Sequence, residues 1–145
     1  MHRVTNLRLK PIRTSDTYVV RHPVLRNGLP LESCVFDRDD DSNTLHLGAY
    51  MGEKLVGVLT LLPNKANVQL RGMAVLHEMQ KKGIGYQLIL EAENRIKNMR
   101  ISLLWLNARL LAVPFYERFG YQKQGEMFNL YHGGNHYKMT KKLCV

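Results

Sequence analysis

The sequence predicts an α/β (α+β) domain with a mixed β-sheet, and three observations support this prediction. Strand-like and helix-like segments follow one another along the 145 residues, with no linker, repeat or low-complexity tract between them. Residues 68–107 contain a strand, a strongly amphipathic helix and a second apolar strand, which is the order of a right-handed βαβ unit. Short turns join the strands before and after this unit, which favours antiparallel pairs.

The first half of the chain is expected to form strands, one helix and an irregular segment. Thr14-Ser15-Asp16 supplies side chains that can begin a helix, and Pro23 should end or kink it. Residues 24–33 are irregular with room for one short helix, and the acidic run at 37–43 is expected to be a solvated loop. Alternating patterns and the turn at Gly52-Glu53-Lys54 predict strands at 7–10, 45–51, 55–62 and 68–75.

The most regular helix pattern occupies Gly83–Met99. Glu91 and Arg95, and likewise Glu93 and Lys97, are spaced to form ion pairs on its exposed face. Its apolar face is expected to consist of Ile84, Leu88, Ile89, Ala92 and Ile96.

The remaining segments are short. The apolar segment 102–108 lacks alternation, which predicts a strand that is buried on both faces. Pro114 is suited to the first turn of a short helix that Gly120 ends. Two more strands are expected, at 121–130 and 137–143, joined through His132-Gly133-Gly134-Asn135.

The composition limits the class of protein and its partners. Lys and Arg number 21 against 12 Asp and Glu, so the net charge is +9, which indicates an anionic partner: nucleic acid, a phosphorylated cofactor or an acidic small molecule. The hydrophobic content of 45% is too high for a disordered chain, and no apolar run approaches the roughly 20 residues of a membrane span. Residues 1–6 do not resemble a signal peptide. A cytoplasmic protein is expected, with Cys34 and Cys144 as reduced thiols.

The segment Gln80-Lys81-Lys82-Gly83-Ile84-Gly85 connects a predicted strand to the most regular predicted helix. Its glycines let the backbone approach a ligand, the helix N-terminus adds partial positive charge, and the lysines add full charges. The segment therefore indicates a pyrophosphate site. It is not a Walker loop, because no Gly-Lys-Ser/Thr follows, and the third glycine of a dinucleotide-binding motif is missing. A solvated turn that opens the helix is the alternative interpretation.

Three arginines and one histidine are candidates for binding and proton transfer. Arg71 lies on an otherwise apolar strand, Arg109 ends the next predicted strand, and Arg26 lies in the irregular segment. Together they would suit an acceptor with more than one negative charge, although each could instead form a structural ion pair. Histidine titrates near neutral pH, and His136, which opens the last predicted strand, could face a cleft or solvent.

The pattern Gln-x-x-Gly-x-Gly after a strand, followed by Asn107 and by Pro114-Phe115-Tyr116 with Gly120-Tyr121, resembles the GNAT superfamily of acetyl-CoA-dependent N-acetyltransferases. The resemblance covers nearly the whole chain and implies a single acetyltransferase domain over residues 1–145. It implies a mostly antiparallel sheet with a central parallel strand pair, flanked by helices. It also implies acetyl-CoA as cosubstrate, no metal, and Tyr116 near the thioester sulfur. The residues implied to hold the CoA are Met73, Ala74, Val75, Gln80, Lys81, Lys82, Gly83, Ile84, Gly85 and Asn107.

A closer similarity, to the glyphosate N-acetyltransferases and their bacterial relatives, lies in the segments that contain Arg26, Arg71, Arg109 and His136. In those enzymes three arginines bind an anionic acceptor and a late histidine is the general base, so the resemblance implies these roles here. Many GNAT enzymes use a glutamate on the central strand as the base, whereas this chain has no acidic residue between Glu53 and Glu78. Leu110-Leu111 and the loop before His136 depart from the family pattern, and both flank the expected acceptor pocket.

The resemblance implies a direct attack of the acceptor amine on acetyl-CoA in a ternary complex. The acceptor would be a small anionic amine, such as an acidic amino acid or an aminophosphonate. His136 would be the base, Tyr116 the acid, and a backbone N–H near Met73 would stabilise the oxyanion. The alternatives are acetylation of a peptide or protein amine, and a CoA-binding regulator without catalysis. Nucleic acid is disfavoured because the basic residues are spread along the chain, no membrane partner is expected, and the protein should be a monomer or homodimer.

Overall fold

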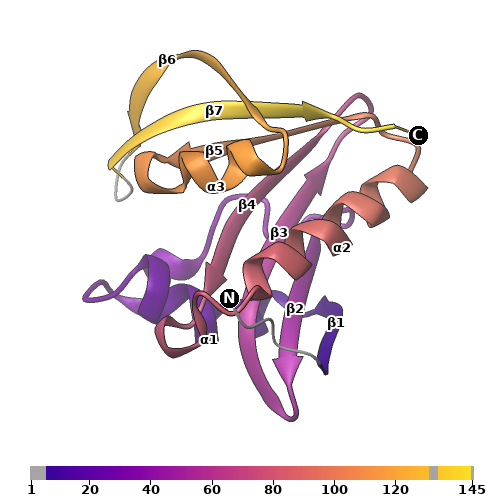
Figure 1. Ribbon diagram of the computed structural model, residues 1–145. Coiled ribbons are helices and arrows are strands. Elements are labelled where there is room, and N and C mark those ends of the chain that lie inside the picture. The colour runs from indigo at the N-terminus through magenta and orange to yellow at the C-terminus, as the bar shows by residue number, and fades with distance from the viewer. Residues whose placement is uncertain (1–5, 131–133, 145) are drawn as a thin grey trace.

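The computed structural model describes residues 6–130 and 134–144, which form one mixed sheet with three helices (Figure 1). The seven strands lie in the order β1-β2-β3-β4-β5-β7-β6, and every neighbouring pair is antiparallel except β4 and β5. The strands are β1 (Leu7–Ile12), β2 (Leu45–Met51), β3 (Lys54–Pro63), β4 (Val68–Val75), β5 (Leu103–Arg109), β6 (Gln122–Leu130) and β7 (Gly134–Lys142). The helices are α1 (Thr14–Leu25), α2 (Ile84–Asn98) and α3 (Val113–Arg118), with 3-10 turns η1 (Leu31–Cys34), η2 (His77–Met79) and η3 (Leu110–Ala112). The predicted fold class is confirmed.

The parallel strands β4 and β5 are paired only over their first residues. Their pairing runs from Val68 opposite Leu104 to Leu70 opposite Leu106, and the strands then diverge (Figure 1). The register of β3 against β4 shifts between Val58 and Thr60, and Gly72 has a φ of 62°, so β4 contains a bulge just after the last of these pairs. The edge of β4 beyond Leu70 therefore carries backbone N–H and C=O groups that no strand within the described residues occupies.

Helices α1 and α2 pack on opposite faces of the sheet. A Cβ added at Gly57 of β3 would lie 3.0 Å from Leu88 and 3.2 Å from Ile84, so this glycine lets α2 approach closely. Thr60, three residues further along β3, instead accepts a hydrogen bond from Arg21 of α1. Residues three apart on a regular strand point to opposite sides, which places the two helices on different faces. In Figure 1, α2 crosses in front of the strands.

The helix predicted at 83–99 has its expected apolar face, since Ile84, Leu88, Ile89, Ala92 and Ile96 are all buried. The ion pair between Glu91 and Arg95 also forms, at 2.7 Å. The expected exposed pair between Glu93 and Lys97 is wrong, because Glu93 is buried. The reason is tertiary: Lys141, near the end of β7, pairs with Glu93 at 3.0 Å.

Two local expectations differ from the structure, and a third lies mostly outside the described residues. The strand at β5 is not buried on both faces: Leu104, Leu106 and Ala108 are buried, whereas Trp105 and Asn107 between them are only half-buried. Pro23 does not end α1 at once, because a proline in the last turn removes a single helical hydrogen bond, and the helix runs two residues further. Of the predicted connection before β7, residues 131–133, including His132, lie outside the described residues.

We expect removal of one hydroxyl group to weaken the contact between α2 and the C-terminal strands. The hydroxyl of Tyr121 donates to the buried carboxylate of Glu93 at 2.8 Å. Replacement of Tyr121 by Phe should lower the free energy of unfolding by about 1–2 kcal/mol, because a charged acceptor loses one donor inside the core. Urea denaturation measures this change. Tyr137→Phe is the matched control, since its ring lies under Lys123 and its hydroxyl has no hydrogen bond among the described residues. Equal effects of the two variants would contradict the prediction.

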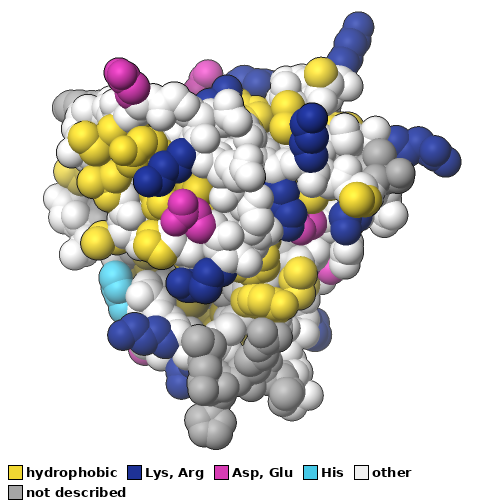
Figure 2. Space-filling view, turned by 45° about the horizontal axis from the view of Figure 1, so that its top comes forward, with side chains coloured by type: hydrophobic (Ala, Val, Ile, Leu, Met, Phe, Trp, Pro, Cys, Tyr) yellow, Lys and Arg dark blue, Asp and Glu magenta, His cyan; other side chains and the backbone are white. Residues whose placement is uncertain are grey.

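The cysteines, the helices and the surface charge can be compared with the expectations from composition. Cys34 is buried and Cys144 is exposed, and both are free thiols, as expected. None of the helices in the described part of the chain is long and apolar enough to cross a membrane. On the face shown in Figure 2, Lys and Arg side chains are spread among hydrophobic and neutral ones and do not gather in one patch.

Candidate active site

The predicted phosphate-binding segment forms the entrance to α2. Gly83, at a φ of 82°, is the N-cap, and no side chain caps the helix, so the first N–H groups of α2 are available to a ligand. Lys81 is also in the left-handed region, at a φ of 63°, and the side-chain amide of Gln80 donates to the carbonyl of Val75 at 2.9 Å. These features hold the loop against the end of β4. The lysines at 81 and 82 are exposed beside it.

This loop lies next to the first residues of the short helix α3. A Cβ added at Gly85 would lie 3.6 Å from the ring of Phe115 and 3.9 Å from Met73 of β4. The loop, the open end of β4 and α3 are therefore neighbours. An elongated ligand with a phosphate group at the loop would extend past Met73, Ala74 and Val75, along the edge of β4 that no strand within the described residues pairs.

Tyr116 is buried in α3, with its ring centroid 5.2 Å from that of Phe115 and 5.7 Å from that of Tyr121. Burial raises the pKa of Tyr116 above its ordinary value, so the phenol keeps its proton at neutral pH. Its hydroxyl has no hydrogen-bond partner among the described residues and can serve as a donor. Asn107, on β5 opposite Lys138, is half-buried and faces away from Leu106 and Ala108.

Two of the predicted arginines meet at the ring of Phe36, in the segment after η1. The guanidinium carbon of Arg26 lies 4.9 Å from the ring centroid, and that of Arg71 lies 5.6 Å from it. Burial, followed by the charge of Arg109, lowers the pKa of Arg26, so the charge of Arg109 acts on Arg26. Three residues far apart in the sequence thus bring positive charge to one region.

Each of these arginines keeps N–H groups for a ligand. Arg26 donates from Nε to the carbonyl of Ser33 at 3.1 Å and from Nη1 to that of Leu25 at 3.0 Å, which leaves Nη2. Arg71 uses only Nη2, and its Nε is buried without a partner. Arg109 is exposed, and its side chain makes no hydrogen bond within the described residues.

His136 lies beside this group. In the sheet register it is directly opposite Arg109 of β5 on one side and Phe128 of β6 on the other. It is buried, and its Nδ1 lies 2.8 Å from the carbonyl oxygen of Gly134, which can only accept a hydrogen bond. We therefore assign the proton to Nδ1, so Nε2 of the neutral ring carries a lone pair. Such a nitrogen can remove a proton from a substrate.

Asp39 belongs to the acidic run that the sequence predicts to be a solvated loop, and its pattern gave no sign of a buried side chain. The other residues of the run at 37–43 are exposed, but Asp39 is 4% exposed and bonds to Arg21 of α1 at 2.7 and 3.1 Å. Arg21 is completely buried, on the stripe of α1 that also holds Thr17 and Val20. An arginine on a buried helix face requires a carboxylate partner, and this was the available signal.

Asp39 should make the free energy of unfolding depend on pH in the acidic range. Burial alone would raise the pKa of Asp39, but the hydrogen bonds and charge of Arg21, together with the N–H of Phe36, hold it below its usual value. Its contribution is therefore complete above about pH 4 and is lost as the pH falls through the folded-state pKa. Between about pH 4 and 2, the free energy of unfolding of Asp39→Asn should fall less steeply than that of the wild type in urea titrations. Asp16 and Glu78, whose pKa values are also lowered, keep part of the slope in both proteins. Identical slopes would contradict this assignment.

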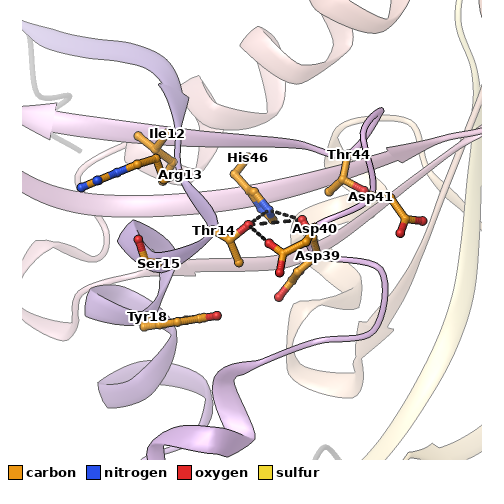
Figure 3. A pocket seen from close by; sticks show the side chains of 10 residues that line it. All are labelled: Ile12, Arg13, Thr14, Ser15, Tyr18, Asp39, Asp40, Asp41, Thr44 and His46. Atoms are coloured by element: carbon orange, nitrogen blue, oxygen red, sulfur yellow. Dashed lines mark hydrogen bonds between the residues drawn. The ribbon is translucent and has the colours of Figure 1, made fainter.

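The cavity in Figure 3, of about 550 Å³, is lined by Asp39 and His46 among others, and by none of the predicted site residues. His46 is buried there, with Nδ1 2.7 Å from Thr60 Oγ1 and Nε2 2.9 Å from the Asp39 carbonyl. Burial lowers the pKa of His46 and favours the neutral ring. Thr14 lies 3.1 Å from Nε2 and donates to Asp40 at 2.7 Å (Figure 3). Since both ring nitrogens of His46 are occupied, this cluster fixes the segment around Asp39.

Comparisons with known proteins bear on the family and the fold. A family profile described as an acetyltransferase (GNAT) domain matches residues 32–143. An uncharacterised N-acetyltransferase from Bacillus subtilis, YitI, is 31% identical over 144 residues, which is 94% of this chain and 97% of that protein.

Solved structures show the same fold at low sequence identity. An Escherichia coli enzyme described as a ribosomal-protein alanine N-acetyltransferase superposes with a TM-score of 0.82 at 17% identity, covering 96% of this chain and 95% of its own. A GNAT-family acetyltransferase from Elizabethkingia anophelis with acetyl-CoA bound gives 0.76 at 15% identity, covering 97% and 100%. Within residues 6–130 and 134–144, no group of three or more His, Cys, Asp or Glu side chains is placed to hold a metal.

Proposed function

This chain belongs to the GNAT family of acetyltransferases, and from that premise we propose that its acceptor is a small amine with more than one negative charge. The chain is an acetyl-CoA-dependent N-acetyltransferase. The proposed acceptor is an acidic amino acid or an aminophosphonate. The proposal is supported by the contact of Arg26 and Arg71 with one aromatic ring, by the effect of the charge of Arg109 on Arg26, and by the position of Arg109 opposite His136 in the sheet. Guanidinium groups bind carboxylates and phosphonates through paired hydrogen bonds.

The residues at the open end of β4 fit acetyl-CoA. The uncapped start of α2 with Lys81 and Lys82 would hold the pyrophosphate, and the backbone of residues 73–75 and Asn107 would hold the pantetheine arm. Acetyl-CoA supplies the activated acetyl group. A backbone N–H near Met73 is proposed to stabilise the negative charge that develops on the acetyl carbonyl oxygen.

Two side chains are proposed to move protons. His136 accepts a proton from the acceptor ammonium at Nε2, and the free amine then forms the new C–N bond as the C–S bond breaks. Tyr116 donates its phenolic proton to the departing thiolate and regains one from the nitrogen of the new amide; burial raises its pKa, so the phenol is protonated at neutral pH. Holding both substrates together supplies a further part of the rate.

The acceptor class is also supported by the similarity to the glyphosate N-acetyltransferases at Arg26, Arg71, Arg109 and His136. The departure at Leu110-Leu111 limits how far this similarity extends. Leu111 is 97% exposed in η3, directly after Arg109. The recognition of negative charge is therefore carried over, and the particular acceptor is left to experiment.

A thiol-release assay with acetyl-CoA tests the proposal. Aspartate, glutamate and aminoalkylphosphonates should be acetylated with the highest kcat/KM, and spermidine, aminoglycosides and peptides with neutral termini should be poor acceptors. Faster turnover of a cationic amine or a peptide would refute the anionic acceptor. If acetyl-CoA binds but no amine causes release of its thiol, the chain would instead be a CoA-binding regulator without catalysis. Lys81→Ala with Lys82→Ala should raise the KM for acetyl-CoA and leave that for the acceptor unchanged.

A further inference from the structure

We propose that Asp39 is a positioning residue for the acceptor, which holds Arg71 in the orientation that binds the substrate anion. This inference rests on the proposed function, because it assigns a role toward Arg71 as an acceptor-binding residue. Asp39 does not touch the expected path of either substrate; it acts through the guanidinium group.

Asp39 is itself fixed in place by four contacts from the protein. Its two carboxylate oxygens accept hydrogen bonds from Nη1 and Nη2 of Arg21, and Oδ2 also accepts the N–H of Phe36 at 2.9 Å. Its carbonyl oxygen lies 2.9 Å from Nε2 of His46. The side chain of Arg21 is completely buried and that of Asp39 is 2% exposed, so water competes little for these contacts.

Asp39 in turn holds one end of the Arg71 guanidinium. Oδ1 accepts a hydrogen bond from Nη2 of Arg71 at 3.2 Å, and the same Nη2 donates to the carbonyl of Asp37. Both contacts use one nitrogen, so the fork is anchored at a single point while Nε and Nη1 keep their N–H groups. The buried Nε has no partner within the described residues.

The adjoining aromatic ring restricts the same group. Phe36 contacts Arg21 and Arg71, whose guanidinium carbons lie 4.0 and 5.6 Å from its centroid. A free arginine side chain has many rotamers, and ordering it on binding reduces affinity. A guanidinium held in one orientation by Asp39 avoids most of that loss. The geometry thus gives Asp39 a role in acceptor affinity that a purely structural ion pair would not have.

The experiment compares Asp39→Asn with the wild type by steady-state kinetics, with aspartate and 2-aminoethylphosphonate as acceptors. Asparagine keeps the size of the side chain and removes its charge. The KM for the acceptor should rise about tenfold, while the KM for acetyl-CoA and the kcat at saturating acceptor change less than about twofold. In an Arg71→Lys background, Asp39→Asn should add less than a twofold change, because the group that it positions is gone.

Asp41→Asn is the matched control, since this exposed carboxylate of the same segment pairs with Arg38 at 2.9 Å and should leave both KM values unchanged. Parallel changes in both KM values and in kcat for Asp39→Asn would show a structural role and overturn the inference. An unchanged acceptor KM in Asp39→Asn would also overturn it. If Asp39→Asn does not fold, Asp39→Glu keeps the charge that Arg21 requires and displaces the carboxylate; its acceptor KM must then rise.

The single variant Arg71→Lys separates this inference from the proposed function. If Arg71→Lys leaves the acceptor KM unchanged, the arginine site itself is wrong. If Arg71→Lys raises it and Asp39→Asn does not, only the positioning role is wrong.

Discussion

Replacement of His136 by alanine is expected to lower kcat by two to three orders of magnitude, about the contribution of a well-placed general base. The reason is that Nδ1 is held by the carbonyl of Gly134, which leaves Nε2 as the proton acceptor next to Arg109. The KM for acetyl-CoA should stay near its wild-type value. Steady-state kinetics at pH 7 with an acidic acceptor measure both constants, and raising the pH should recover part of the rate because more of the acceptor is then unprotonated.

His77→Ala is a suitable control, because this exposed histidine lies in η2, with Nε2 3.3 Å from the carbonyl of Pro23. Added imidazole should partly restore the His136→Ala variant and have no effect on the control. Full activity of His136→Ala at neutral pH would exclude the histidine as the base.

The second large effect is expected at the arginines. Arg71→Ala and Arg109→Ala should each raise the acceptor KM by roughly 10- to 100-fold, the range of charge-assisted hydrogen bonds to an anion. The effect should be larger for acceptors with two negative charges than for those with one. Acetyl-CoA affinity, measured by calorimetry in the absence of acceptor, should not change.

Arg38→Ala provides the comparison for these variants, since Arg38 is exposed and, within residues 6–130 and 134–144, its side chain pairs only with Asp41. An acceptor KM that is equal in Arg71→Ala, Arg109→Ala and Arg38→Ala would remove the basis for an anionic acceptor. A rise in the acetyl-CoA KM alone would place the arginines at the cofactor instead.

Local sequence patterns predicted those elements whose stabilising residues lie close together in the sequence. The helix at 83–99 carries a complete apolar face, and the turn at 52–54 separates two strongly apolar segments, so their positions follow from spacing. The burial of β5 did not follow, because it depends on which helices cover the sheet. The place of Glu93 was missed for the same reason: its partners Tyr121 and Lys141 are 28 and 48 residues away.

The candidate site shows the same division. Single residues with unusual settings, such as Arg71 on an apolar strand, could be selected from the sequence because their polarity conflicts with their neighbours. The residues that hold these side chains in place could not be selected in this way, since Asp39 looks like any other member of an acidic run. What distinguishes it is a buried arginine 18 residues earlier in the chain, and only the folded structure brings the two together.

The bulge at Gly72 has a consequence for how this enzyme could change. Arg71 is opposite Thr60 and Ala74 is opposite Val58, so two residues three apart on β4 share one face of the sheet only because of the extra residue between them. The same extra residue precedes the open edge of β4. A Cβ at position 72 would lie 3.2 Å from Phe36 and 3.4 Å from Nε of Arg21, so this position tolerates little besides glycine. Under the proposed function, both substrates would depend on this one backbone irregularity, and adaptation to a new acceptor would be confined to the surrounding side chains while the strand itself stays fixed.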